Sequence, residues 1–208
     1  MLQQTTVRAV LPYYKRWIAL FPDVRVLARA RLEKVLRAWQ GLGYYERARN
    51  MHRTARLLVR DYGGGIPRDE ALVSRLPGFG AYTTAAVMSL AYNKPLPVVD
   101  ANVRRVLMRL LGIEGPARLV GEKGLVARLR TFFPDAKPGL FNQAMMELGA
   151  LVCRSRNPLC LSCPVRPYCR AVQAGKQDII PEPKKRSTQR IEASVAVIGR
   201  DRRYLVHK

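Results

Sequence analysis

All the cysteines of the chain lie within one short segment, residues 153–169, and this segment limits the possible folds more than any other. Cys153, Cys160, Cys163 and Cys169 follow a C-x6-C-x2-C-x5-C spacing. In a reducing cytosol disulfides are not expected, whereas four thiolates can coordinate a metal centre. Only the central pair has the spacing of a zinc knuckle, and the prolines between the cysteines oppose helix formation. A loop around a 4Fe-4S cluster is therefore favoured, with zinc as the alternative and disulfides third.

The charge of the chain indicates a polyanionic partner. Lys and Arg number 37 against 15 Asp and Glu, a formal net charge of +22 over 208 residues. The positive residues are spread along the chain, so nucleic acid is the expected partner, with an acidic membrane surface as the alternative. Arginines beside the cysteines can offset the charge of a cluster and contact phosphates: Arg154, Arg156, Arg166 and Arg170. Because no apolar run could span a membrane and no leader is recognisable, we expect a cytoplasmic, nucleoid-associated protein.

Much of the chain has the apolar periodicity of helices. Apolar residues recur at steps of three and four in the segments 6–20, 32–42, 69–76, 83–92 and 103–111. Each apolar face predicts a contact with a core. A chain of this length can form one good core or two small ones.

The stretch LPGFGAYTT separates two of these helices. Gly78 and Gly80 permit a tight turn whose backbone N–H groups can approach a phosphate, and the next helix adds the partial positive charge of its N-terminus. Two glycines alone more often form an ordinary turn, but here they lie between two helical patterns in a strongly basic chain. Together with Leu76 and Pro77, they predict a helix-hairpin-helix element that binds DNA.

Asp100 stands where a proline-containing segment ends and the helix of residues 103–111 begins. The commonest use of aspartate in such a place is as a helix N-cap. A carboxylate at the mouth of a DNA groove is the functional alternative, and the two uses are compatible because helix N–H groups can hold the carboxylate in place. Arg104, on the non-apolar face of the helix, is a candidate DNA contact.

Several motifs, in this order, resemble one family. LPGFGAYTTAAVMSLAYNKPLPVVDANVRRVL, followed by FNQAMMELGALVC and the cysteine loop, resembles the helix-hairpin-helix, Gly/Pro-rich, Asp superfamily of DNA glycosylases. Within it, MLQQT, GLGYYERARNMH and FNQAMMELGA resemble the MutY family, whose members remove adenine mispaired with 8-oxoguanine or guanine. The resemblance covers residues 1–174 and implies an all-α glycosylase core of two helical lobes. One lobe is a six-helix barrel that carries the hairpin, and the other carries the 4Fe-4S loop and both chain ends.

The resemblance also implies the chemistry. The target base is flipped out, because its glycosidic bond cannot be reached inside the stack. Asp100 matches the aspartate that stabilises the positively charged sugar, and Asn102 is expected to position Asp100. Tyr82 stands where bifunctional relatives carry a nucleophilic lysine, so the reaction is expected to be hydrolysis without a lyase step.

Recognition of the mispair is assigned by the resemblance to other residues. Gln3 and Gln4 match residues that enter the duplex near the mispair, and Tyr44 matches the wedge stacked beside 8-oxoguanine. Such stacking can contribute about 1–3 kcal/mol per base. Outside this context, Gln3 and Gln4 would be read as solvated side chains and Tyr44 as a packing residue. His52 and His207 are given no role.

Both ends depart from the family pattern. The family's catalytic glutamate, which protonates adenine, precedes MLQQT by two positions and so falls before Met1. An intact enzyme is therefore expected to begin upstream, and the chain of 208 residues to be impaired. After a basic linker at 175–190, residues 191–208 alternate like the start of a Nudix-like β domain, expected to be truncated before it can form a core.

The sequence leaves three functions open. MLQQT, GYY and FNQA favour an adenine DNA glycosylase of base excision repair, acting as a monomer on double-stranded DNA with A:8-oxoG or A:G mispairs. The second is a related glycosylase of thymine mismatches or oxidised pyrimidines, which Tyr82 and Asp100 suit equally well. The third is a non-catalytic DNA-binding iron–sulfur protein.

Overall fold

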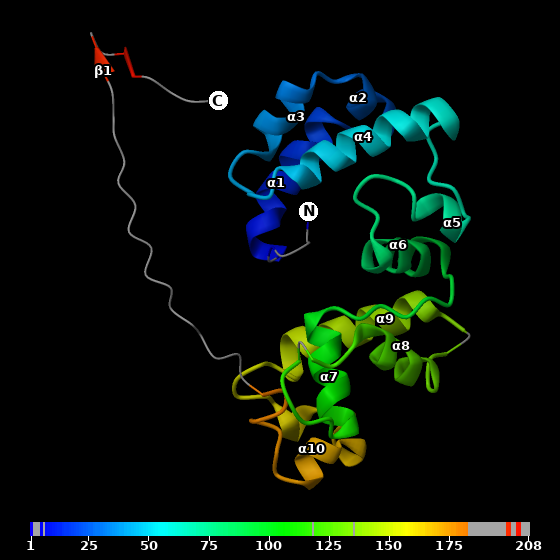
Figure 1. Ribbon diagram of the computed structural model, residues 1–208, viewed down its shortest axis with the longest axis vertical. Helices are drawn as coiled ribbons and strands as arrows, with labels where there is room; N and C mark the ends of the chain where they lie inside the picture. Colours follow the sequence, from blue (N-terminus) through cyan, green and yellow to red (C-terminus); the bar gives the residue numbers. More distant parts are fainter. Residues whose placement is uncertain are drawn as a thin grey trace.

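The computed structural model describes residues 1, 5, 7–117, 119–134, 136–182, 199–200 and 203–204. Apart from two short strands, its regular structure is helical, as predicted. The α-helices are α1 (Val7–Leu20), α2 (Val24–Arg29), α3 (Leu32–Trp39), α4 (Glu46–Asp61), α5 (Glu70–Val73), α6 (Ala81–Tyr92), α7 (Ala101–Leu111), α8 (Glu122–Arg130), α9 (Pro138–Glu147) and α10 (Arg170–Gln173). Figure 1 shows α1 to α4 gathered at one end of the molecule and α7 to α10 at the other, with α5 and α6 between them.

The predicted helices are present, with small shifts at their ends. Asp69 does not enter α5 but caps it, since its carboxylate accepts a hydrogen bond from the Leu72 N–H at 3.0 Å. The helix expected over 32–42 ends at Trp39, where the Trp39 indole N–H donates to the Gly43 carbonyl at 2.9 Å and closes the chain over the helix end. Local side-chain bonds therefore set both boundaries.

Three groups of buried apolar residues hold the helices together. The first joins α1 to α4 around Trp17 and Trp39, whose rings meet edge to face with 5.5 Å between centroids. The second joins α7, α8 and α9 around the fully buried Leu107, Leu125 and Leu129. The third lies under the cysteine loop and consists of Met108, Cys169, Ala171 and Ile180. The core is thus divided between the two ends of the molecule, in agreement with two helical lobes.

The structure gives positions for Met1 and His52 that the sequence did not predict. Met1 packs against this core, and Figure 1 shows the N-terminus beside α1, whereas the resemblance implied that both chain ends lie with the cysteine loop. His52 is buried, with its Nε2 3.0 Å from the Ala30 carbonyl. It therefore fastens α4 to the turn between α2 and α3.

The chain continues to pack after α10. Ile180 is 2% exposed, and the N–H of Glu182 donates to the Gly115 carbonyl at 3.1 Å. β1 (Gly199–Arg200) and β2 (Arg203–Tyr204) pair antiparallel within the segment expected to begin a β domain. The Nudix-like domain itself stays a prediction, because most of residues 183–208 lie outside the described part of the chain. In the part that is described, no helix combines the length and apolar composition needed to cross a membrane.

Candidate active site

Asp100 is held at the start of α7 through both of its carboxylate oxygens. Oδ1 accepts from the Val103 N–H at 2.7 Å, so the predicted N-cap is present. Oδ2 accepts from the Asn102 side-chain amide at 3.3 Å. A carboxylate fixed in this way can face a developing positive charge without reorganising first.

Tyr82 lies in the first turn of α6 and is electrostatically coupled to Asp100. Burial raises the pKa of Tyr82, and the charge of Asp100 raises it further. Its hydroxyl lies 3.9 Å from the Met146 sulfur of α9. Because the pKa is shifted upward from an ordinary value of about 10, the side chain stays a neutral phenol at neutral pH.

A chain of hydrogen bonds connects Asp100 to the start of the cysteine loop. The Asn102 amide that binds Asp100 accepts, through its oxygen, from Arg105 Nη2 at 2.9 Å. The Arg105 guanidinium also donates to the carbonyls of Gly149 and Cys153, each at 2.7 Å. The orientation of Asp100 therefore depends on the segment that leads into the cysteines. Nothing in the sequence marks Arg105 for this role.

Gly149 allows this segment to lie directly against the start of α7. A Cβ atom on Gly149 would come within 2.7 Å of the Asn102 Cβ. We expect Gly149→Ala to displace Asn102, to lower the free energy of unfolding by about 1–3 kcal/mol and to slow any reaction that depends on Asp100. Thermal denaturation measures the loss of stability. Gly124→Ala in α8, where an added Cβ meets nothing within 4 Å, is the matched control, and equal melting temperatures for the two variants would contradict the expectation.

The LPGFG stretch connects α5 to α6 as the predicted hairpin. Leu76 is buried, and the Thr54 hydroxyl donates to the Pro77 carbonyl at 2.8 Å, so the turn is anchored on α4. Gly78 has a φ of +83°, a conformation that favours glycine. Gly78 and Gly80 are exposed, which leaves their backbone groups accessible to a partner.

The predicted recognition residues are described only in part. Tyr44 projects from the loop between α3 and α4 with 67% of its surface exposed. Gln3 and Gln4 lie outside the described residues, so their position stays a prediction.

Arg104, predicted to contact DNA, is engaged within the protein. Its Nη1 donates to the Ala117 carbonyl at 3.2 Å and to the Val120 carbonyl. The guanidinium thus holds the loop between α7 and α8. A DNA contact by Arg104 stays a prediction.

Asn142, within the FNQA motif, positions the site and was not singled out from the sequence. Its buried amide nitrogen donates to the Ser89 hydroxyl at 2.9 Å and to the Leu96 carbonyl at 2.8 Å. Its amide oxygen accepts from the Val98 N–H at 3.1 Å. These bonds tie α9 to α6 and to the extended segment that ends at Asp100. Its place in the FNQA motif, and its polar side chain among the apolar positions of a helix, were the sequence features that could have marked it.

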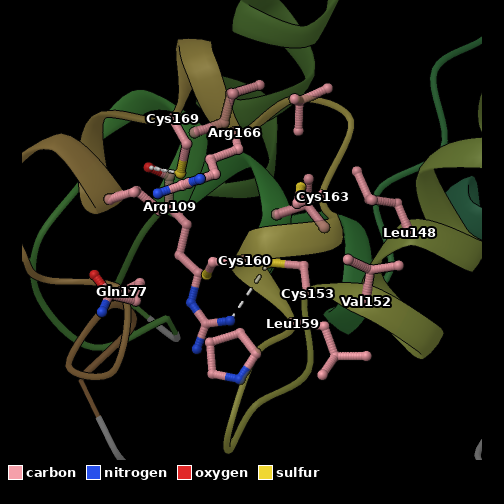
Figure 2. A pocket seen from close by; sticks show the side chains of 15 residues that line it. Arg109, Leu148, Val152, Cys153, Leu159, Cys160, Cys163, Arg166, Cys169 and Gln177 are labelled. Atoms are coloured by element: carbon pink, nitrogen blue, oxygen red, sulfur yellow. Dashed lines mark hydrogen bonds between the residues drawn. The ribbon is translucent and has the colours of Figure 1, made fainter.

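All four cysteines line one pocket, which Figure 2 shows from close by. Their thiols are free, so the disulfides considered as a third alternative are not formed. Burial raises the pKa of Cys160, and the neighbouring thiols of Cys153 and Cys169 add to this effect. In the described part of the chain, no three His, Cys, Asp or Glu side chains are grouped closely enough to hold a metal ion.

The side chain of Arg109 enters the same pocket (Figure 2). It is 2% exposed, and its Nη1 lies 3.4 Å from the Cys153 sulfur. Nε and Nη1 also donate to the carbonyls of Ile180 and Arg154, each at 2.6 Å. Among the described residues no carboxylate lines the pocket, and a buried guanidinium is costly unless an anion compensates it. The pocket therefore places a buried positive charge beside the four thiols, with no carboxylate among its described lining residues.

Comparison with known proteins identifies the family. Residues 1–125 match the HhH-GPD superfamily of base excision DNA repair proteins. The adenine DNA glycosylase of Mus musculus is 45% identical over 187 residues, which cover 87% of this chain and 36% of the mouse protein. That of Mycolicibacterium smegmatis is 42% identical over 177 residues, covering 84% of this chain and 59% of the relative. The chain belongs to the HhH-GPD superfamily, as its motifs predicted, and it spans about a third of the length of the mouse and human relatives, 36% and 33%.

Solved structures support the same fold. A thermostable thymine-DNA glycosylase matches with a TM-score of 0.74 and 30% identity, over 83% of this chain and 80% of the other. An endonuclease III trapped as a covalent intermediate with DNA matches with a TM-score of 0.72 and 26% identity, over 84% and 81%. The predicted helix-hairpin-helix glycosylase fold is confirmed.

Proposed function

We propose that this chain is an adenine DNA glycosylase of base excision repair, which removes adenine opposite 8-oxoguanine or guanine by N-glycosidic hydrolysis. The observation that carries the glycosylase reaction is the Asp100 carboxylate, fixed by the Val103 N–H and by Asn102. Its curated relatives, at 45% identity in mouse and 42% in Mycolicibacterium smegmatis, are adenine DNA glycosylases.

In this proposal the residues of the site act on an adenine that has been turned out of the duplex. Water adds across the N-glycosidic bond, so adenine leaves with a proton and the sugar C1′ gains a hydroxyl. Asp100 stabilises the positive charge that builds on the sugar as the bond breaks. Protonation of adenine is assigned to the glutamate that the family carries two positions before MLQQT. Tyr82 has no amine to form a Schiff base, so the DNA strand is left uncut.

A glycosylase of thymine mismatches is the second candidate. It is favoured by the 30% identity to a thermostable thymine-DNA glycosylase that covers 83% of this chain. Tyr82 and Asp100 do not separate the two candidates. The two candidates are separated by the identity of the base that is released.

The proposed partner is double-stranded DNA. The chain carries a net charge of +22. DNA could be contacted by the exposed glycines of the hairpin, by Tyr44 and by the exposed arginines of the cysteine loop. These arginines are Arg154, Arg156, Arg166 and Arg170. The protein would act as a monomer on chromosomal DNA, in the nucleoid region of the cytoplasm.

Duplex binding tests the proposal. We expect a duplex with 8-oxoguanine opposite adenine to bind more tightly than a fully paired one, because only the mispair lets the base be extruded at low cost. Affinity for both should fall about 10³-fold between about 50 and 200 mM salt, since cations are released from the phosphates. Titrations use a chain with Asp100→Asn, so that the base is not removed during the measurement. Equal affinity for the two duplexes, or affinity independent of salt, would count against DNA recognition of this kind.

We further propose that the four cysteines bind a 4Fe-4S cluster. Each cysteine of such a cluster binds a different iron, so the thiols surround a pocket, whereas zinc requires them to converge on one ion. The thiols here line one pocket, together with the buried Arg109, whose charge opposes that of an anionic cluster. When bound, the cluster would supply negative charge and four covalent links across the loop. Arg109 would then orient Cys153 and neutralise part of this charge.

A further inference from the structure

The loop between α3 and α4 presents its most exposed aromatic residue in an unusual backbone conformation. Tyr44 is 67% exposed and has a φ of +48°, whereas Leu42 nearby is buried. A residue other than glycine with a positive φ is uncommon and persists where its surroundings impose it. Contacts around the loop must therefore supply this constraint.

Arg47, in the first turn of α4, supplies such contacts. Its Nη2 donates to the carbonyls of Leu42 at 3.2 Å and Gly43 at 3.3 Å, the two residues before Tyr44. The guanidinium carbon lies 5.2 Å from the centroid of the Trp39 ring and 5.5 Å from that of Tyr44. At these distances a cation and an aromatic ring attract each other. One planar group thus contacts both the backbone of the loop and the ring that the loop presents.

The same guanidinium reaches the MLQQT segment. Its Nη1 donates to the Met1 carbonyl at 2.9 Å and to the Thr5 hydroxyl at 3.3 Å. Burial lowers the pKa of Arg47, but a guanidinium stays charged at neutral pH. Arg47 therefore joins the two parts of the chain that the family resemblance assigns to recognition near the mispair.

We propose that Arg47 is a positioning residue for lesion recognition, which holds Tyr44 in its projecting conformation and fixes it relative to the MLQQT segment. This inference rests on the proposed function, in which Tyr44 stacks beside the mispair. A ring that is already held in place loses little conformational freedom on binding, so more of the stacking energy contributes to affinity for the lesion.

Lysine cannot reproduce this set of contacts. A lysine ammonium is a point charge on a flexible stem, whereas the guanidinium offers donors in one plane and stacks on rings. Arg47→Lys should therefore keep the charge and lose the geometry, and Arg47→Met should lose both.

A double-mutant cycle with Tyr44→Ala tests the proposal. The quantity measured is the dissociation constant for a fully paired duplex divided by that for a duplex with 8-oxoguanine opposite adenine. Every variant also carries Asp100→Asn, so that adenine is not removed during the measurement. We expect Arg47→Met and Arg47→Lys each to lower this ratio about tenfold, the effect of losing the stacking of one base. In the Tyr44→Ala background the same changes should have no further effect, because the ring that Arg47 holds is gone.

The matched control is Arg49→Met, on the same helix. Arg49 is exposed and lies 4.0 Å from Glu46, so its loss removes one positive charge and should weaken both duplexes equally, leaving the ratio unchanged. Melting curves identify variants that fold, and Arg47→Lys decides the matter if Arg47→Met does not. An unchanged ratio in a folded Arg47 variant, or an equal loss in the Tyr44→Ala background, would overturn the proposal. If the parent chain itself shows no preference for the lesion duplex, the proposed function has failed instead.

Discussion

Replacing Asp100 with asparagine is expected to slow single-turnover release of adenine by about 10²–10³-fold, while duplex binding and melting temperature stay nearly unchanged. Asparagine caps helices as well as aspartate does, so the bond from the Val103 N–H is kept. What is lost is the negative charge that we propose stabilises the sugar. A large effect on rate with little effect on stability would separate the catalytic use of this residue from its use as a cap.

The control for Asp100 is a second aspartate with the same local geometry. Asp23 caps α2 by accepting from the Val26 N–H at 2.8 Å, and it lies with the first core, so Asp23→Asn makes the same chemical change at another cap. Rates are compared in the chain as it is and in the chain extended by a glutamate two positions before Met1. Similar rates for Asp100→Asn and its parent in the extended chain would remove Asp100 from the mechanism.

Removing the iron of the proposed cluster is expected to open residues 153–182 while α1 to α4 stay folded. The third core group includes Cys169 itself, and the loop between the cysteines contains only short helical turns, Cys160–Ser162 and Arg166–Tyr168. Without an anionic cluster, the buried charge of Arg109 loses its compensation. The first core contains no cysteine and has its own packing around Trp39.

Hydrogen exchange before and after chelation measures this difference within one molecule. Amides in 153–182 should exchange about 100-fold faster after iron is removed, which corresponds to about 3 kcal/mol of local stability, while those of α4 should not change. Arg109→Met should lose its cluster to a chelator faster than the parent, as followed by visible absorbance. Arg156→Met, at an exposed position in the same loop, should not. Protein purified anaerobically with one zinc, and with neither iron nor sulfide, would reject the cluster.

Features that depend on neighbouring residues could be predicted from the sequence. The periodic helices, the glycine turn and the Asp100 cap are all local, and the cysteine spacing is visible in a single segment. The helices that were not foreseen are α2, α4, α8, α9 and α10. α2 has six residues, and α4 buries mostly small or polar ones, Ala48, His52, Thr54 and Ala55, with Leu58.

The residues that hold the candidate site together could not be predicted in the same way. Arg105, Arg109 and Asn142 each bind partners more than 40 positions away, and Arg47 reaches back to Met1. A single arginine on a helix is normally solvated, so the sequence gives no reason to expect a buried one. The packing of α7 against the segment before the cysteines turns Arg105 and Arg109 inward.

Identifying the base that is released tests the proposed function most directly. The extended chain is incubated in excess with duplexes containing 8-oxoguanine opposite adenine, guanine opposite thymine, or thymine glycol, and the free bases are separated and identified by mass spectrometry. We predict release of adenine from the first duplex, no base from the other two, and a strand break only after alkali. Release of thymine or thymine glycol, with adenine left in place, would contradict the assignment.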